Sequence, residues 1–381
     1  MGTHRVRRAV AAAALAVAVM LGAGGWAAAD AQTAVTGPPP GSAAWTADTS
    51  LGLRLPDPAT ASAAEVAAFF AGLSPAQQDE LIARHPLVAG NLDGAPVELR
   101  YRANALALAA ARTEELSRAA DPALTPEDHR AARTRAERYG TLLDGHRRIL
   151  AFDPRGRGQI AEVYGDLAHA AHTAVIVPGS DIDLLTYDRA SDPYGTPAGM
   201  ARALYEATAA TGTGTGTGTA VIAWAGYTTP VGLGPDAATE RLAEAGAARL
   251  TALLDGLAAS TRPQAPAALF CHSYGSVVCG LSRPGPAEAS RLVVLGSPGM
   301  GVDSADELDP RVPVFATARN DSDWIGDVPH VRLLGLGHGA DPTDPAFGAR
   351  PLPATGSHGH TGYFAPGTAS LAAYAALALG R

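Results

Sequence analysis

The chain has 381 residues, of which 47% are hydrophobic and 17% are charged, so it is long enough to bury a large core. Its formal net charge of −8 argues against a nucleic-acid-binding protein, which needs a basic surface for phosphates. All 29 basic residues are arginine, because the sequence contains no lysine. This excludes pyridoxal-phosphate Schiff bases, lysine-dependent aldolases, P-loop phosphate sites and Ser-Lys dyads.

The N-terminal segment has the pattern of a secretory signal peptide. Three arginines in the first eight residues precede an uncharged stretch over 9–29, and small residues follow as in an A-x-A cleavage site. We therefore expect residues 1–31 to be a signal peptide and the protein to be secreted, with only transient membrane contact during export. The alternative is an uncleaved membrane anchor, because the uncharged stretch is long enough to cross a bilayer. Residues 32–58 are rich in Pro, Gly, Ala and Thr, which predicts a flexible leader.

The rest of the chain divides into two regions of different texture. Residues 59–168 form an expected helical extension, in which Ser74-Pro75 and Thr125-Pro126 are helix starts. Residues 169–381 alternate short apolar runs with amphipathic helices, which predicts an α/β fold with a mostly parallel sheet covered by helices on both faces. The runs are 173–177, 220–225, 267–271, 292–295 and 312–318. The Thr-Gly tract at 211–219 is an expected loop insertion.

A serine follows the third apolar run in the sequence Cys271-His-Ser273-Tyr-Gly275. This is the layout of a nucleophile elbow, a sharp strand-to-helix turn that exposes a serine hydroxyl above the sheet. The usual pattern is G-x-S-x-G, and Cys271 stands where the first glycine is expected. Cysteine is small enough for the close approach of strand and helix at this turn. An ordinary turn is the alternative interpretation.

Acidic residues and histidines follow Ser273 in the order that α/β hydrolases use for a catalytic triad. Asp323 comes after the fifth apolar run, and His360 precedes the last expected helix. A serine hydroxyl needs an imidazole to take its proton, and the imidazole needs a carboxylate to orient it. We predict Ser273, Asp323 and His360 as the triad. Asp321 and His358 are the alternatives, because two residues that are two apart in an extended segment point to one side.

An oxyanion hole needs two backbone N–H groups that point toward the developing negative charge. We expect one from Tyr274, which follows the nucleophile. The other is expected from Ser180, in the loop after the first strand, where Gly179 permits a close approach. Trp224 and Tyr227 follow the second strand and are candidates to line a substrate pocket; closing the core under the loop is an equal alternative.

The only two cysteines, Cys271 and Cys279, could form one disulfide in an exported protein, or could be two small buried side chains. A metal-dependent hydrolase is a rival interpretation, because the C-terminal third is rich in histidine and aspartate. No HExxH motif or comparable ligand spacing is present, so we expect neither a metal nor another cofactor. The residues of that region are His330, His338, His358, His360, Asp327 and Asp341.

Several segments together resemble a secreted α/β-hydrolase family of high-GC Gram-positive bacteria that is catalogued as a domain of unknown function. The segments are LSPAQQDELIARHPLVAGNLDG, VIVPGSDID, AWAGYTTP, CHSYGS, DWIGDVPHV, GLGHGADP and HGHTGYF. The resemblance runs from about Leu73 to the C-terminus and implies an α/β-hydrolase core with an N-terminal helical extension. It supports Ser273 in CHSYGS, Asp323 in DWI and His360 in HGHTGY, and it implies no particular substrate.

The sequence therefore predicts a secreted, cofactor-free serine hydrolase that forms an acyl-enzyme with a small-molecule ester or, as a weaker alternative, an amide. A non-catalytic binding protein with the same fold is the second interpretation, because a fold does not fix a function. No long apolar lid stands between Ser273 and Asp323, so we do not predict a lipase that acts at interfaces.

Overall fold

The computed structural model describes residues 31–145, 147–211 and 218–381. Nearly all of the expected signal peptide and most of the Thr-Gly tract therefore lie outside the described residues. Within the described ranges, six helices precede the sheet. They are α2 (Ser42–Thr46), α3 (Ala63–Ala71), α4 (Pro75–Arg84), α5 (Pro86–Asn91), α6 (Val97–Ala120) and α7 (Pro126–Leu143). The helix starts expected at Ser74-Pro75 and Thr125-Pro126 are present, and each N-cap side chain accepts a backbone N–H.

The segment expected to be a flexible leader is packed against these helices. Trp45 of α2 is fully buried, and its Nε1–H donates to the carbonyl of Pro56 at 2.7 Å. Its ring belongs to the same apolar cluster as Phe70 of α3 and Leu81 of α4. A composition rich in Pro and Gly does not reveal this, because one buried aromatic ring is enough to fix a short segment.

The sheet has eight strands in the order β1-β2-β4-β3-β5-β6-β8-β10. Its strands are β1 (Arg148–Asp153), β2 (Gln159–Tyr164), β3 (His172–Val177), β4 (Thr219–Ala225), β5 (Ala267–His272), β6 (Ala289–Leu295), β8 (Val314–Thr317) and β10 (Arg350–Leu352). The first two form an antiparallel hairpin, β2 pairs antiparallel with β4, and all other neighbours are parallel.

The hairpin β1–β2 corrects the expected domain boundary, because it lies inside residues 59–168, which were expected to be helical. Its turn contains Gly156 and Gly158, both with positive φ, which allows the chain to reverse within a few residues. The sheet therefore begins at Arg148, and the helical extension is shorter than the sequence suggested.

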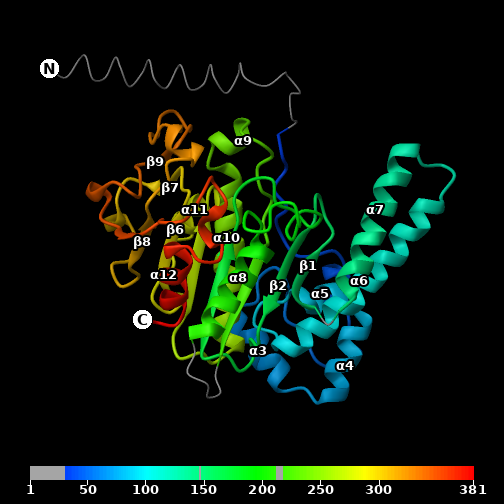
Figure 1. The fold of residues 1–381 in the computed structure, drawn as a ribbon. Helices are drawn as coiled ribbons and strands as arrows, with labels where there is room; N and C mark the ends of the chain where they lie inside the picture. The colour runs from blue at the N-terminus through cyan, green and yellow to red at the C-terminus, as the bar shows by residue number, and fades with distance from the viewer. Residues whose placement is uncertain (1–30, 146, 212–217) are drawn as a thin grey trace.

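Helices cover both faces of the sheet (Figure 1). Successive residues of β3 point to opposite sides: Val175 and Val177 belong to one core cluster, and Ala174 and Ile176 belong to the other. The first cluster includes α10 (Arg241–Ser260) and α11 (Gly275–Ser282), and the second includes α8 (Pro197–Thr211) and α12 (Ala369–Ala378). The predicted mostly parallel sheet with helices on both faces is confirmed.

Candidate active site

Ser273 stands at a sharp turn between the end of β5 and the start of α11. Its φ is 55°, in the left-handed region that a residue with a side chain seldom adopts. The turn is crowded, because a methyl group added at Gly275 would lie 2.4 Å from the carbonyl oxygen of Val177 in β3. A strained serine between a buried strand and a helix is the geometry of a nucleophile elbow.

The cysteine that replaces the first glycine of the elbow pattern is bonded across the turn. Cys271, in β5, forms a disulfide with Cys279, in α11, and their Cα atoms are 6.4 Å apart. Both side chains are fully buried. The bond therefore links the strand and the helix on either side of Ser273.

Asp323 and His360 form a hydrogen-bonded pair near this turn. The distance between His360 Nδ1 and Asp323 Oδ1 is 2.8 Å. Asp323 is 7% exposed, and its second oxygen accepts the hydroxyl of Tyr363 at 2.5 Å. Burial raises the pKa of Asp323, but hydrogen bonds from His360, Tyr363 and the Ile325 N–H outweigh it and leave this pKa below its usual range. The carboxylate is therefore ionised and can orient the imidazole.

Burial distinguishes this pair from the two alternatives that spacing left open. Asp321 and His358 are both exposed, whereas Asp323 is buried. Neighbouring residues hold the loops that carry the pair together: the amide of Asn320 donates to the Gly359 carbonyl at 2.8 Å, and the Gly359 N–H donates to Ser322 Oγ at 2.8 Å.

The His360 imidazole lies against the same chain segment that Ser273 contacts. The Ser273 N–H donates to the Leu295 carbonyl at 3.0 Å, and a methyl group added at the next residue, Gly296, would lie 3.0 Å from His360 Cε1. The other ring nitrogen of His360, Nε2, is buried and has no hydrogen-bond partner among the described residues. The structure therefore brings the serine and the histidine against the same segment after β6, but Nε2 makes no hydrogen bond to Ser273 Oγ or to any other described residue.

Two aromatic rings flank the His360 imidazole. The ring centroids of Trp324 and His272 are each 4.7 Å from that of His360. The His272 side chain also hydrogen-bonds the His360 carbonyl through Nε2, at 2.8 Å. Burial, with a smaller contribution from His360, lowers the pKa of His272 to about 3, so this ring is neutral beside its neighbour. Sequence reasoning assigned neither Trp324 nor Tyr363 a place here, although both stand within three residues of a predicted triad member.

The loop after β3 approaches the elbow closely enough to supply an oxyanion donor. A methyl group added at Gly179 would lie 2.6 Å from Ser273 Cβ and 2.9 Å from its Oγ. The N–H groups of Tyr274 and Ser180 donate no hydrogen bond to any other residue in the described part of the chain. Both predicted donors are therefore available to an oxygen atom beside Ser273.

Trp224 and Tyr227 lie in the core rather than in a substrate-sized pocket, although Tyr227 also lines a small cavity of about 10 Å³ beside Val35 and Arg157. Each is 3% exposed, their rings stack at a centroid distance of 5.7 Å, and both belong to the core. The Tyr227 hydroxyl donates to the Pro178 carbonyl at 2.7 Å, so it holds the loop that carries Gly179 against the core. Both β4 faces are buried, which is why a tryptophan near the end of this strand points into the core.

The acidic and histidine-rich C-terminal region does not assemble as a metal site. No group of three or more His, Cys, Asp or Glu side chains suited to a metal ion is present among the residues that the structure describes. His330 and Asp341 are close, but the Arg319 guanidinium contacts both, and its positive charge disfavours a cation there.

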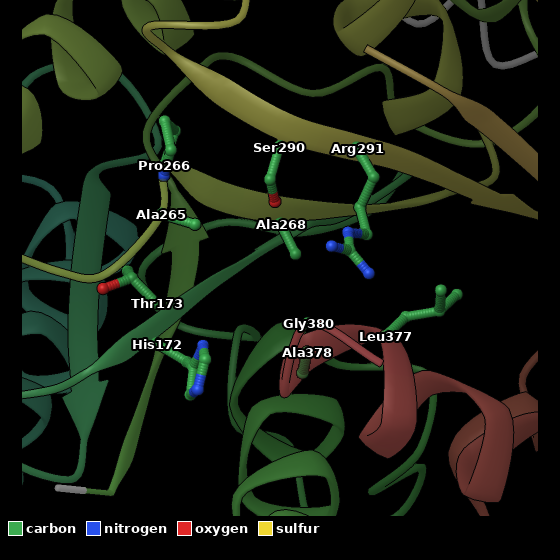
Figure 2. Close-up of a pocket in the computed structure, with 10 residues that line it drawn as sticks. All are labelled: His172, Thr173, Ala265, Pro266, Ala268, Ser290, Arg291, Leu377, Ala378 and Gly380. Carbon is green, nitrogen blue, oxygen red and sulfur yellow. The ribbon is translucent and has the colours of Figure 1, made fainter. Parts of the chain in front are cut away.

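A small cavity lies at the opposite, amino-terminal edge of the sheet. Figure 2 shows Arg291 and Ser290 from β6 and His172 from β3 around it, beside the end of α12. Its volume of about 10 Å³ matches roughly one water molecule, and none of the predicted triad or oxyanion residues lines it. It is therefore not a substrate site for the serine.

Comparison with known proteins identifies the fold. A sequence profile of an α/β-hydrolase family matches residues 153–333, which include the elbow and Asp323. The chain has the α/β-hydrolase fold. The family match supports a hydrolase.

Two uncharacterized proteins of Mycobacterium tuberculosis are similar in sequence. Rv2079 of strain H37Rv and MT2140 of strain CDC 1551 are each 28% identical to the chain over 388 aligned residues. The alignment covers 86% of this chain but only 57% of each relative. The chain thus spans little more than half the length of these relatives.

Several solved structures are similar in part. They include the apo form of Thermogutta terrifontis esterase 2, with a TM-score of 0.33, 13% identity, and coverage of 58% of this chain and 87% of that one. A truncated carbohydrate esterase from gut microbiota has a TM-score of 0.30, 13% identity, and coverage of 58% and 90%. The 2,6-dihydroxy-pseudo-oxynicotine hydrolase has a TM-score of 0.30, 14% identity, and coverage of 77% and 80%.

Proposed function

We propose that this protein is an exported serine hydrolase that cleaves carboxylic esters through an acyl-enzyme. Ser273 is the nucleophile, His360 the general base, and Asp323 the residue that orients the imidazole. The observation that carries the proposal is the state of His360: Nδ1 is held by the ionised Asp323 at 2.8 Å, while the buried Nε2 has no hydrogen-bond partner among the described residues. A base held in this way beside a strained serine is suited to take its proton.

In the first half of the reaction, Ser273 Oγ attacks the acyl carbon of the ester as its proton moves to His360 Nε2. The carbonyl oxygen becomes an oxyanion, which accepts hydrogen bonds from the backbone N–H groups of Tyr274 and Ser180. The intermediate collapses, the bond from carbon to the leaving oxygen breaks, and the imidazolium protonates the departing alcohol. The acyl group remains on Ser273 as an ester.

In the second half, a water molecule attacks the acyl carbon and gives a proton to His360 Nε2. The second tetrahedral intermediate collapses, the acid leaves, and the proton returns to Ser273 Oγ. The cycle consumes one ester and one water, and it releases one alcohol and one acid. Asp323 stays ionised throughout and stabilises the imidazolium that forms twice in each cycle.

Covalent labelling with a fluorophosphonate tests the assignment of the nucleophile. We expect one label per chain on Ser273, no label in Ser273→Ala, and normal labelling in Ser282→Ala, a control serine at the end of α11, the helix that follows Ser273. Hydrolysis of p-nitrophenyl esters of increasing acyl length would then define the substrate. Absence of both labelling and hydrolysis in folded protein would favour a non-catalytic binding protein.

A further inference from the structure

Exposed apolar side chains are concentrated on two loops at the carboxyl edge of the sheet. Among the described residues, 12 large apolar side chains are substantially exposed, and half of them belong to these loops. We call them the apolar rim: Val231, Leu233, Val331, Leu333, Leu334 and Leu336. Single exposed leucines are ordinary, but a contiguous group marks a contact surface.

The two loops of the apolar rim are joined. The short helix α9 (Pro235–Ala238) directly follows the first loop. The Gly337 N–H donates to the Ala238 carbonyl at 2.8 Å, and His338 Nε2 hydrogen-bonds the Ala237 carbonyl at 2.8 Å. Figure 1 shows α9 and the loops beside β9 (His338–Gly339) at the same end of the molecule. The rim is therefore one surface made by two loops.

Leu334 is held outward at the tip of the second loop. Leu333 and Leu336 close a tight turn with two backbone hydrogen bonds of 2.9 and 3.0 Å. Leu334 inside this turn is 94% exposed and has a φ of 54°. The left-handed conformation is unfavourable for leucine, and its exposure gives the folded chain no burial in return. Its apolar surface is thus available only to something outside the described chain.

The apolar rim borders the candidate active site. The Tyr274 hydroxyl donates to the carbonyl of Thr239, the residue after α9, at 2.7 Å, and the Tyr274 ring contacts that of His338. At the other end of the second loop, Trp324 is 40% exposed and packs on His360. The rim and the candidate active site therefore share the carboxyl edge of the sheet, joined through Tyr274 and His338.

The point at which the N-terminal segment joins the described chain lies at the same edge. The Gln32 N–H donates to Asp236 of α9 at 2.6 Å, and its carbonyl accepts the Arg241 guanidinium at 2.7 Å. Residues 9–29, just before this point, are uncharged and apolar. No helix in the described part of the chain is long and apolar enough to cross a membrane. A lipid bilayer that contains residues 9–29 would therefore lie at the same edge of the molecule as the rim.

We propose that the apolar rim binds a lipid surface and turns the site toward it, so that the substrates are acyl esters presented in that surface. The choice of substrate rests on the proposed function, whereas lipid binding by the rim does not. The sequence showed no long apolar lid, and none is needed, because the leucines are carried on short loops.

Vesicle flotation tests the rim directly. The chain from Ala31 is used, because it contains all three apolar clusters and the whole sheet but lacks the apolar N-terminal segment. We expect it to float with phosphatidylcholine vesicles. The double variant Leu333→Ser/Leu334→Ser should bind at least about tenfold more weakly, because each leucine loses its apolar burial in the lipid. The control variant Leu106→Ser/Leu116→Ser removes two exposed leucines, 44% and 49% exposed, from α6 and should bind normally.

Equal flotation of the rim variant and the control would overturn the proposal. A second result would also overturn it: the unaltered chain is a dimer that does not bind vesicles, and the rim variant is a monomer. The rim would then be an interface between two copies of the chain. Activity provides a separate test: the rim variant should hydrolyse soluble p-nitrophenyl acetate normally and lose activity on p-nitrophenyl palmitate embedded in vesicles. If the unaltered chain hydrolyses neither ester, the proposed function fails while flotation still decides the role of the rim.

Discussion

The His272 side chain hydrogen-bonds the carbonyl oxygen of His360 at 2.8 Å, so the residue before the proposed nucleophile holds the main chain of the proposed base. The bond joins two segments that are 88 residues apart in the sequence. It fixes the distance between the elbow and the imidazole more directly than the sheet does. His272 therefore acts as a positioning residue.

Loss of this bond should reduce turnover more than substrate binding. We expect His272→Phe, which keeps a ring but has no donor, to lower kcat about tenfold, because the imidazole is no longer held in line with Ser273. His272→Gln can still donate to the carbonyl and should recover part of the rate. Steady-state kinetics on a soluble ester measure both; a Gln variant as impaired as the Phe variant would contradict the positioning role.

The Tyr363 hydroxyl should support catalysis indirectly, by holding the Asp323 carboxylate in place. Tyr363→Phe removes the donor to the buried Oδ2, and a hydrogen bond to a charged group is worth about 1.5–3 kcal/mol. We expect kcat to fall roughly 10- to 100-fold. Tyr374→Phe is the matched control, since its buried hydroxyl pairs with the Thr317 hydroxyl at 2.7 Å and has no hydrogen bond to Asp323 or His360 among the described residues. It should lower thermal stability but leave kcat unchanged. Equal kcat losses in the two variants would indicate a general packing effect.

Gly179 should tolerate no side chain, because its Cα faces Ser273. In Gly179→Ala the added methyl would lie 2.6 Å from Ser273 Cβ, so the oxyanion loop or the serine must move. We expect activity to fall at least about a hundredfold, as when an oxyanion donor is lost. Gly285→Ala is the control, since its added methyl would meet only Glu288 at 3.9 Å. Normal kinetics in Gly179→Ala would place the oxyanion hole elsewhere.

The disulfide should stabilise the elbow. A closed loop between residues eight apart contributes about 2–3 kcal/mol by the chain-entropy estimate. We expect the double variant Cys271→Ser/Cys279→Ser to lose about this free energy of unfolding in urea, and its Ser273 to react more slowly with a fluorophosphonate. A reducing agent should lower the free energy of unfolding and the labelling rate of the unaltered protein in the same way, and should leave both unchanged in the double variant. An unchanged labelling rate would show that the disulfide does not affect the geometry of the elbow.

Some parts of this molecule can be predicted from local sequence. The parallel strands are short apolar runs that alternate with helices, and that pattern follows directly from burial of both faces of a sheet. The hairpin β1–β2 was missed because its strands are interrupted by charged residues, such as Glu162, that find partners only in the fold. Glu162 is 5% exposed and binds the Arg147 guanidinium at 2.6 Å.

The candidate site shows the same division. The spacing of the acids and histidines indicated two pairs but could not choose between them, because burial of Asp323 depends on Tyr363, which is 40 residues away. The orientation of Trp224 was equally undecidable, since it depends on which neighbours its strand acquires in the sheet. The apolar rim was invisible to a search for apolar runs, because its members are separated by glycine and arginine.

Acid should destabilise the folded protein, in part through His272. Burial lowers its pKa from 6.5 to about 3, so between these values the unfolded chain binds a proton that the folded chain does not. The free energy of unfolding is therefore unaffected by this group above about pH 6.5 and decreases by up to about 1.4 kcal/mol per pH unit as the pH falls toward 3. Asp323 has a lowered pKa and adds to the loss only near and below its ordinary value of 3.8.

Urea unfolding at pH 7, 6 and 5 can isolate the His272 contribution. His272→Gln cannot titrate, so its stability should decline less steeply over this interval than that of the unaltered chain, whatever its stability at pH 7. The slope should not vanish, because burial also lowers the pKa of His330 and His338 and both act in the same direction. Parallel curves for the two proteins would show that His272 is protonated or solvated in the folded state, which contradicts a neutral ring packed against His360.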